Sequence, residues 1–133
     1  MRFLNTEHEN KLIELIQRDG THPKDKERIS LFYILSGNAD LFVKSGFIYD
    51  FKNHQIEPEC LVNGSVDFCS SSRALIRLGY NLYNGYQDDM TTPLDILSGL
   101  DVDNYLLAME SLDIRLGYSK QVQSSLDDEE LEL

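Results

Sequence analysis

The sequence contains few cysteines and few basic residues, and it has no long apolar run. Two cysteines are too few for a disulfide framework, so we expect Cys60 and Cys69 to be reduced, partly buried thiols. No apolar stretch approaches the roughly 20 residues that a membrane-spanning helix requires. The N-terminus lacks a basic region followed by an apolar one, so we expect no secretory signal and predict a cytoplasmic location.

Basic residues number 12 against 23 acidic ones, which gives a net charge of −11. Phosphate backbones repel such a chain, so direct nucleic-acid binding is disfavoured. The acidic surplus serves solubility or attracts a protein partner with a basic surface, and both interpretations stay open. The candidate interaction surface consists of Asp50, Glu57, Glu59, Asp67, Asp88 and Asp89. Their spacing matches no metal-binding loop, which favours a solvated role over metal binding.

The length of 133 residues predicts one domain, which we place at residues 1–118. Residues 119–133 form an acidic tail that includes Asp127, Asp128, Glu129 and Glu130, and we expect this tail to be disordered. Helix start and stop signals predict helices over residues 6–19, 23–37 and 39–45. Thr6 and Glu9 match a capping box for the first helix, and Pro23 is expected at the first position of the second.

Aromatic and β-branched residues at 47–51 and Ile56, around a turn at residues 52–54, predict a small β-hairpin before Pro58. A short helix is expected to begin at Thr92-Pro93, and Asp101 is expected to cap the last helix. In that last helix five residues recur at helical spacing and are expected to form its core-facing side. They are Val102, Tyr105, Leu106, Met109 and Leu112.

The helix predicted over residues 70–84 carries apolar residues on two sides, among them Leu75, Leu78 and Leu82. We therefore expect it to lie at the centre of the fold. Gly79 inside it costs about 1 kcal/mol relative to alanine, which indicates the close approach of another element. The predicted fold is mainly α (α+β): a compact bundle of five to six helices around this central helix, with the small β-hairpin inserted.

Ser71, Ser72, Arg73 and Arg77 are the candidate ligand-binding residues. The start of a helix offers free N–H groups to an anion, and the two arginines lie one turn apart. The competing interpretation, a helix cap with arginines paired to the domain's own carboxylates, is favoured because a serine cap is the commoner role. A zinc site built from Cys60, Cys69 and His54 lacks paired-ligand spacing. We expect no catalytic set, no metal and no cofactor.

The chain resembles a family of small uncharacterised proteins of Gram-positive bacteria and their mobile elements. The resemblance covers residues 1 to about 117 and lies in residues 22–25, 31–38, 48–51, 58–61, 70–78, 81–86 and 93–95. It implies a bacterial cytoplasmic setting and supplies no catalytic residue.

The function predicted from the sequence is that of a non-catalytic interaction or regulatory protein acting through its acidic surface. An acidic inhibitor that occupies a basic groove on a nucleic-acid enzyme is one form of this. The alternatives are a protein that binds a small anion or carboxylate ligand at the serine–arginine helix start, and an enzyme of unknown class.

Overall fold

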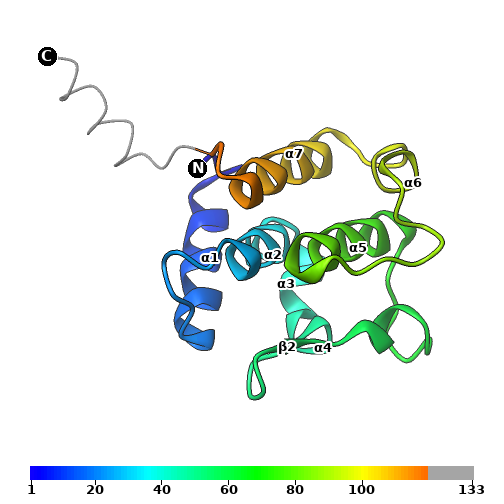
Figure 1. The fold of residues 1–133 in the computed structure, drawn as a ribbon, viewed down its shortest axis with the longest axis horizontal. Helices are drawn as coiled ribbons and strands as arrows, with labels where there is room; N and C mark the ends of the chain where they lie inside the picture. Colours follow the sequence, from blue (N-terminus) through cyan, green and yellow to red (C-terminus); the bar gives the residue numbers. More distant parts are fainter. Residues whose placement is uncertain (120–133) are drawn as a thin grey trace, which may run out of the picture.

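The computed structural model describes residues 1–119 and confirms a mainly helical fold with a small hairpin (Figure 1). Residues 120–133, which hold most of the predicted acidic tail, lie outside the described residues. The helices are α1 (Thr6–Asp19), α2 (Lys26–Gly37), α3 (Ala39–Val43), α4 (Ser45–Ile48), the 3₁₀ helix η1 (Pro58–Leu61), α5 (Ser70–Asn84), α6 (Pro93–Leu97) and α7 (Val102–Leu116). The hairpin strands are β1 (Tyr49–Asp50) and β2 (Gln55–Ile56).

Helix α2 is the centre of the bundle, and α1, α5 and α7 pack around it (Figure 1). Every residue from Ile29 to Ser36 is buried, so this helix is covered on all sides along that stretch. The sequence-based choice of the helix from Ser70 as the centre was therefore wrong, although Leu75, Leu78 and Leu82 are buried as predicted. Helix α5 packs mainly against α2, α6 and α7 and keeps a partly exposed polar side.

The contact between α2 and α5 accounts for the glycine inside α5. A Cβ atom built on Gly79 would lie 2.7 Å from Cδ1 of Leu31, which is fully buried on α2. The two helices thus approach closely at the position that the sequence indicated. The loss of helix propensity at this glycine is offset by the packing of a large apolar side chain on its Cα.

Several helix ends follow their local signals, and two do not. Thr92 and Asp95 form a capping box on α6, Asp101 caps α7, and Gly85 ends α5 in the left-handed conformation. Helix α1 is capped by Asn5, whose side chain accepts a hydrogen bond from the backbone N–H of His8, and not by Thr6. Helix α2 begins at Lys26 after Asp25, so Pro23 lies in the preceding turn.

The hairpin is shorter than predicted. Its antiparallel pairs are Tyr49 with Ile56 and Asp50 with Gln55. The predicted helix at 39–45 ends at Val43, and Phe47 belongs to the next short helix, α4, instead of a strand. A short run of aromatic and β-branched residues does not distinguish a strand from a turn of buried helix. Such a run is too short for the apolar residues to repeat at helical or at strand spacing. Pro58 opens η1.

The side of α7 that packs against the core is opposite to the side that was predicted to do so. Its buried residues are Leu107, Ala108, Ser111 and Ile114. Val102, Tyr105 and Leu106 are 74%, 45% and 49% exposed. The prediction was wrong because α7 carries apolar residues on two opposite sides, and periodicity alone does not show which side packs inward. The helix therefore presents an apolar face to solvent.

Candidate functional site

Three of the four predicted ligand-binding residues line one pocket between α5 and α6. Ser71, Arg73 and Arg77 contribute to this space of about 310 Å³, together with Asp95 and Ser98. Ser72 is only 2% exposed and lies outside the lining. The shared helix brings Arg73 and Arg77 together, since positions four apart face the same side, and Ser71 lies in the first turn of the same helix.

The arginines of this pocket are already bound by the protein. Arg77 donates from Nε to Oδ2 of Asp88 at 2.9 Å. Arg73 donates to the carbonyl oxygens of Leu61 at 2.8 Å and Phe68 at 3.2 Å. These bonds fix the loop before α5 and the loop after it. Asp88 neutralises Arg77, and Arg73 already uses two of its donors on backbone carbonyls, so fewer donors remain for an anion.

Cys69 occupies the N-cap position of α5 and is exposed, whereas Cys60 is buried. Sγ of Cys69 lies 3.3 Å from the hydroxyl of Ser71 and donates to the hydroxyl of Ser72 at the same distance. The hydrogen bonds with Ser71 and then Ser72, together with their backbone N–H groups, lower the pKa of Cys69 to about 7. Burial raises the pKa of Cys60. The expectation of two partly buried thiols was wrong for Cys69. The sequence did contain a signal for the lowered pKa, because Cys69 directly precedes a predicted helix start.

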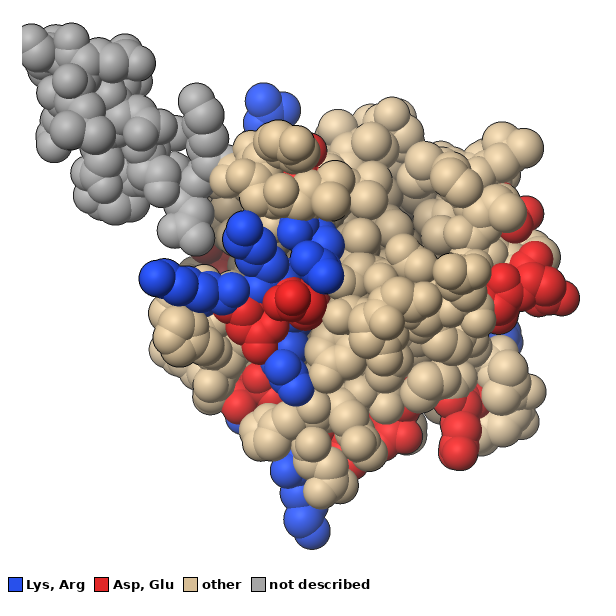
Figure 2. Space-filling view, viewed as in Figure 1, with Lys and Arg blue, Asp and Glu red and all other residues tan. Residues whose placement is uncertain are grey.

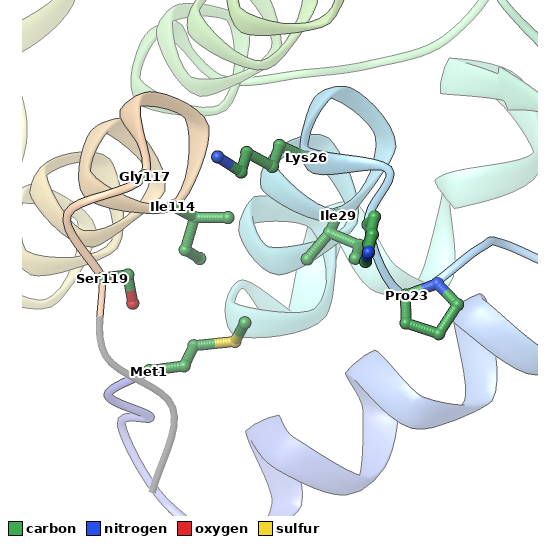
Figure 3. Close-up of a pocket in the computed structure, with 8 residues that line it drawn as sticks. Met1, Pro23, Lys26, Ile29, Ile114, Gly117 and Ser119 are labelled. Atoms are coloured by element: carbon green, nitrogen blue, oxygen red, sulfur yellow. The ribbon is translucent and has the colours of Figure 1, made fainter. Parts of the chain in front are cut away.

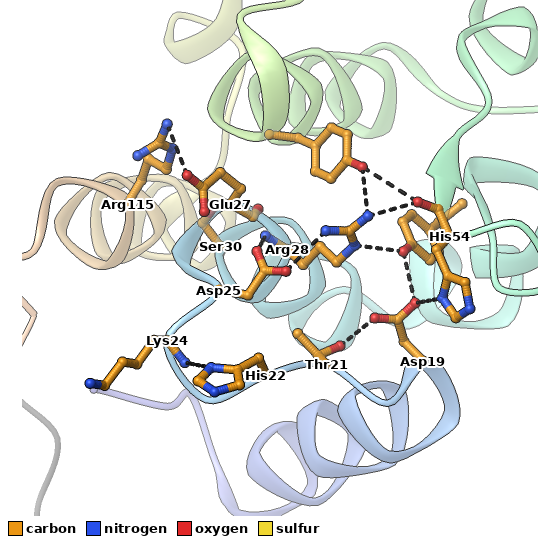
Figure 4. A network of polar contacts seen from close by, with 12 residues as sticks. Asp19, Thr21, His22, Lys24, Asp25, Glu27, Arg28, Ser30, His54 and Arg115 are labelled. Atoms are coloured by element: carbon orange, nitrogen blue, oxygen red, sulfur yellow. Dashed lines mark hydrogen bonds and ion pairs between the residues drawn. The ribbon is translucent and has the colours of Figure 1, made fainter.

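A polar network around the carboxylate of Asp19 joins elements that are far apart in sequence (Figure 4). Asp19 ends α1, and its Oδ1 accepts hydrogen bonds from the hydroxyl of Tyr49 and from Nδ1 of His54, both at 2.7 Å. Burial by itself raises the pKa of Asp19, but hydrogen bonds from Thr21, His54 and Tyr49 outweigh it and lower the pKa. The carboxylate is thus held in its charged form.

Arg28 of α2 extends this network to α5. Its Nε donates to the hydroxyl of Tyr49 at 2.9 Å, and one terminal nitrogen donates to the carbonyl of His54 at 2.8 Å and the hydroxyl of Tyr83 at 3.1 Å. His54 has a left-handed backbone with φ of 57°. The side chain of His54 is half exposed and oriented by a buried carboxylate, which is the arrangement of a general base. Neither Asp19 nor His54 lines the pocket between α5 and α6 or any of the three further pockets described below.

The zinc alternative finds no support in this geometry. His54 contacts Asp19, while Sγ of Cys60 lies 3.3 Å from the hydroxyl of Tyr80. Within residues 1–119 no three His, Cys, Asp or Glu side chains are placed to hold a metal ion.

The largest of the four pockets, about 370 Å³, lies between α2 and the end of α7 (Figure 3). Ile29 and Ile114 form apolar walls, and Lys26 reaches across toward Gly117. Ser119, the last described residue, lies on its edge.

The predicted acidic residues separate into different environments. Glu57 and Glu59 line a notch of about 190 Å³ with Phe47 and Val66. Glu57, Glu59 and Asp67 form no ion pair with any residue from 1 to 119. Asp50 instead accepts backbone bonds in the hairpin turn, and Asp88 is paired with Arg77. Asp89 is exposed on the loop after α5.

Charge is unevenly distributed over the surface. In Figure 2 Lys and Arg gather over the ends of α2 and α7, the centre of the view over α5 is largely uncharged, and acidic side chains gather along the right and lower-right edges. Arg28 and Arg115 pair with Asp25 and Glu27. On the face shown in Figure 2 acidic side chains also lie among the basic ones.

A protein-family model matches residues 1–129, and the family is described as a family of unknown function (DUF6075). No curated protein and no solved structure matches the chain. None of the helices in the described part of the chain has the length and apolar character needed to cross a membrane.

Proposed function

Because the chain belongs to the DUF6075 family, whose function is unknown, we propose its function from the geometry: a non-catalytic interaction or regulatory protein that binds a basic segment of another protein. One observation carries the proposal. Glu57 and Glu59, which have no ion-pair partner among residues 1–119, flank a notch beside Phe47, which is 59% exposed. The notch joins two carboxylates to an uncovered aromatic ring.

This combination suits a lysine or arginine side chain. The aliphatic stem of such a side chain packs on an apolar surface while its charged end stays in a polar environment. Here the stem would lie on Phe47, and the cation would lie between Glu57 and Glu59. The net charge of −11 adds long-range attraction for a basic partner and repels nucleic acid. An inhibitor of a nucleic-acid enzyme with a basic groove is one form of this function.

The proposed setting is the cytoplasm of Gram-positive bacteria, including proteins carried on their mobile elements. The resemblance described above supports an origin in Gram-positive bacteria, and the composition supports a cytoplasmic location. We propose no direct contact with membrane, because the surface surplus of acidic residues is repelled by anionic lipid headgroups.

The test uses the full chain and an arginine-rich peptide as the probe. The double variant Glu57→Gln with Glu59→Gln removes two charges at the notch, and Glu9→Gln with Glu14→Gln removes two exposed charges on α1. We expect the notch variant to bind about tenfold more weakly and the α1 variant to change affinity by less than about twofold. Equal losses in both variants would show that only net charge matters. An affinity independent of salt would remove the electrostatic argument.

A small-anion or carboxylate-binding function is the second candidate, favoured because Ser71, Arg73 and Arg77 share one pocket. The existing bonds of both arginines weigh against it. An enzyme of unknown class requires titratable groups within hydrogen-bond reach of each other in a concave pocket. Asp19 and His54 meet the first requirement and do not line the pockets described above.

A further inference from the structure

The outward side of α7 carries a stripe of uncovered apolar residues. Val102, Tyr105, Leu106 and Leu116 are 74%, 45%, 49% and 63% exposed, and Met109 between them is partly buried. Their spacing of three, four, seven and fourteen residues from Val102 places them on one side of the helix. This side lies opposite Leu107 and Ile114, which face the core. Such a stripe is typical of a helix that has a further neighbour on that side, and α2 and α5, which pack on α7, contact its other side.

A groove runs along this stripe. It has a volume of about 220 Å³ and lies between the segment before α1 and the side of α7. Phe3, Leu4, Tyr33, Leu106 and Met109 form its apolar lining. The backbone N–H of Arg2 donates to Oε2 of Glu110 at 3.1 Å and joins its two walls. The groove is large enough for one aliphatic or aromatic side chain inserted from outside.

Acidic residues follow one edge of the stripe. Asp103, Glu110 and Asp113 recur at intervals of seven and three residues on that edge. On the other edge Arg115 is already engaged, with Glu27 at 3.7 Å and with the carbonyl of Leu82 at 2.6 Å. When two α7 helices pack antiparallel, each edge of one helix lies beside the same edge of the other. A second copy of the chain docked in this way would therefore place acidic edge against acidic edge, which is repulsive.

We propose that the outward face of α7 and its groove form a docking surface for an amphipathic helix with an apolar face and basic flanks. Helix α7 has 15 residues, so its stripe is about 22 Å long and matches a partner helix of about four turns. An apolar side chain of the partner fills the groove beside Tyr33, and its lysines or arginines meet Asp103, Glu110 and Asp113. This surface lies at the opposite end of the bundle from the hairpin (Figure 1). It is independent of the notch at Glu57 and Glu59, and together the two surfaces allow the protein to hold two basic segments at once.

The test uses the full chain and a helical peptide of the same length as α7, with leucines on one face and lysines elsewhere. The variant Val102→Ser with Leu106→Ser changes two exposed residues, so folding is preserved and is checked by circular dichroism. The matched control is Val43→Ser with Val62→Ser, at sites that are 81% and 76% exposed on other elements. We expect the α7 variant to bind the peptide at least about tenfold more weakly and the control to bind within about twofold of the unchanged chain.

Two further measurements decide which kind of partner binds the α7 surface. A twin peptide with glutamate in place of lysine is expected to bind at least about tenfold more weakly, and equal binding would overturn the charge argument. The variant Glu9→Gln with Glu14→Gln on α1 is expected to bind the leucine–lysine peptide within about twofold of the unchanged chain. A loss of binding confined to Glu57→Gln with Glu59→Gln would overturn the α7 surface while leaving the notch proposal standing. Concentration-dependent dimers in sedimentation that Val102→Ser with Leu106→Ser abolishes would assign the face to a second copy and overturn the proposal.

Discussion

Gly37, the last residue of α2, lies directly against the side chain of Leu107 on α7. A Cβ atom at position 37 would overlap Cδ2 of Leu107 and lie 2.9 Å from the ring of His8. Leu107 is fully buried and His8 is 2% exposed, so neither side chain has space to move. We therefore expect Gly37→Ala to lower the free energy of unfolding by about 2 kcal/mol, as overpacking does in other cores. Urea denaturation followed by circular dichroism measures this change.

Gly99 provides the matched control. A Cβ atom at Gly99 meets nothing within 4 Å. We expect Gly99→Ala to change the free energy of unfolding by less than about 0.5 kcal/mol. Similar effects at positions 37 and 99 would contradict the close packing of α2 on α7.

The sequence predicted those features of the fold that depend on neighbouring residues. The capping of α6 by Thr92 and the end of α5 at Gly85 are set within one helical turn, so local signals were sufficient. The identity of the central helix depends on how many sides of α2 are covered, which is a property of the whole bundle. The unbroken apolar run at residues 31–35 was the signal for it.

The candidate sites show the same limit. Ser71, Arg73 and Arg77 line one pocket because they share one helix, whereas Ser72, which was grouped with them, does not line it. Asp19 and His54 are 35 residues apart, and no spacing rule connects them. The outward face of α7 was visible as an apolar stripe, but its direction follows from which side meets α2 and α5. Tertiary packing, which periodicity does not encode, decides all of these relations.

The Asp19 network predicts a pH dependence of stability. The pKa of Asp19 is lowered from its ordinary value of 3.8 in the folded state, so its stabilising contribution is complete above that value. It is lost as the pH falls through the lower folded value. We expect Asp19→Asn to reduce stability at neutral pH by about 2 kcal/mol, because bonds to a charged acceptor are replaced by weaker ones. The same variant should show a shallower loss of stability below pH 3.8, measured by urea denaturation at several pH values. An unchanged slope would contradict the assignment.

Cys69 is predicted to react selectively. Its pKa of about 7 makes half of it thiolate near neutral pH, whereas an ordinary cysteine reaches this point near about pH 8.5. We expect iodoacetamide to label Cys69 and not Cys60, which is buried and has a raised pKa. The pH profile of labelling, followed by mass spectrometry, should have its midpoint near 7.

Ser71→Ala tests the cause of this reactivity. The hydroxyl of Ser71 is the largest influence that lowers the pKa of Cys69, so its removal should move the labelling midpoint to higher pH. Ser70→Ala, one residue earlier on the same helix, is the control and should leave the midpoint in place. Equal shifts in the two variants would show that the helix start as a whole, and not the hydroxyl, is responsible.

Arg73 distinguishes a structural role from a ligand-binding one. Its guanidinium holds the carbonyls of Leu61 and Phe68, which lie in and after η1 and precede α5. We expect Arg73→Ala to lower the free energy of unfolding by about 2 kcal/mol without any ligand, because two charge-assisted hydrogen bonds are lost. Millimolar phosphate should leave the melting temperature of the unchanged chain where it is, since both arginines of the pocket are already bound. A phosphate-induced rise in melting temperature that disappears in Arg77→Ala would instead favour the serine–arginine pocket as an anion site, because a ligand stabilises only the state that binds it.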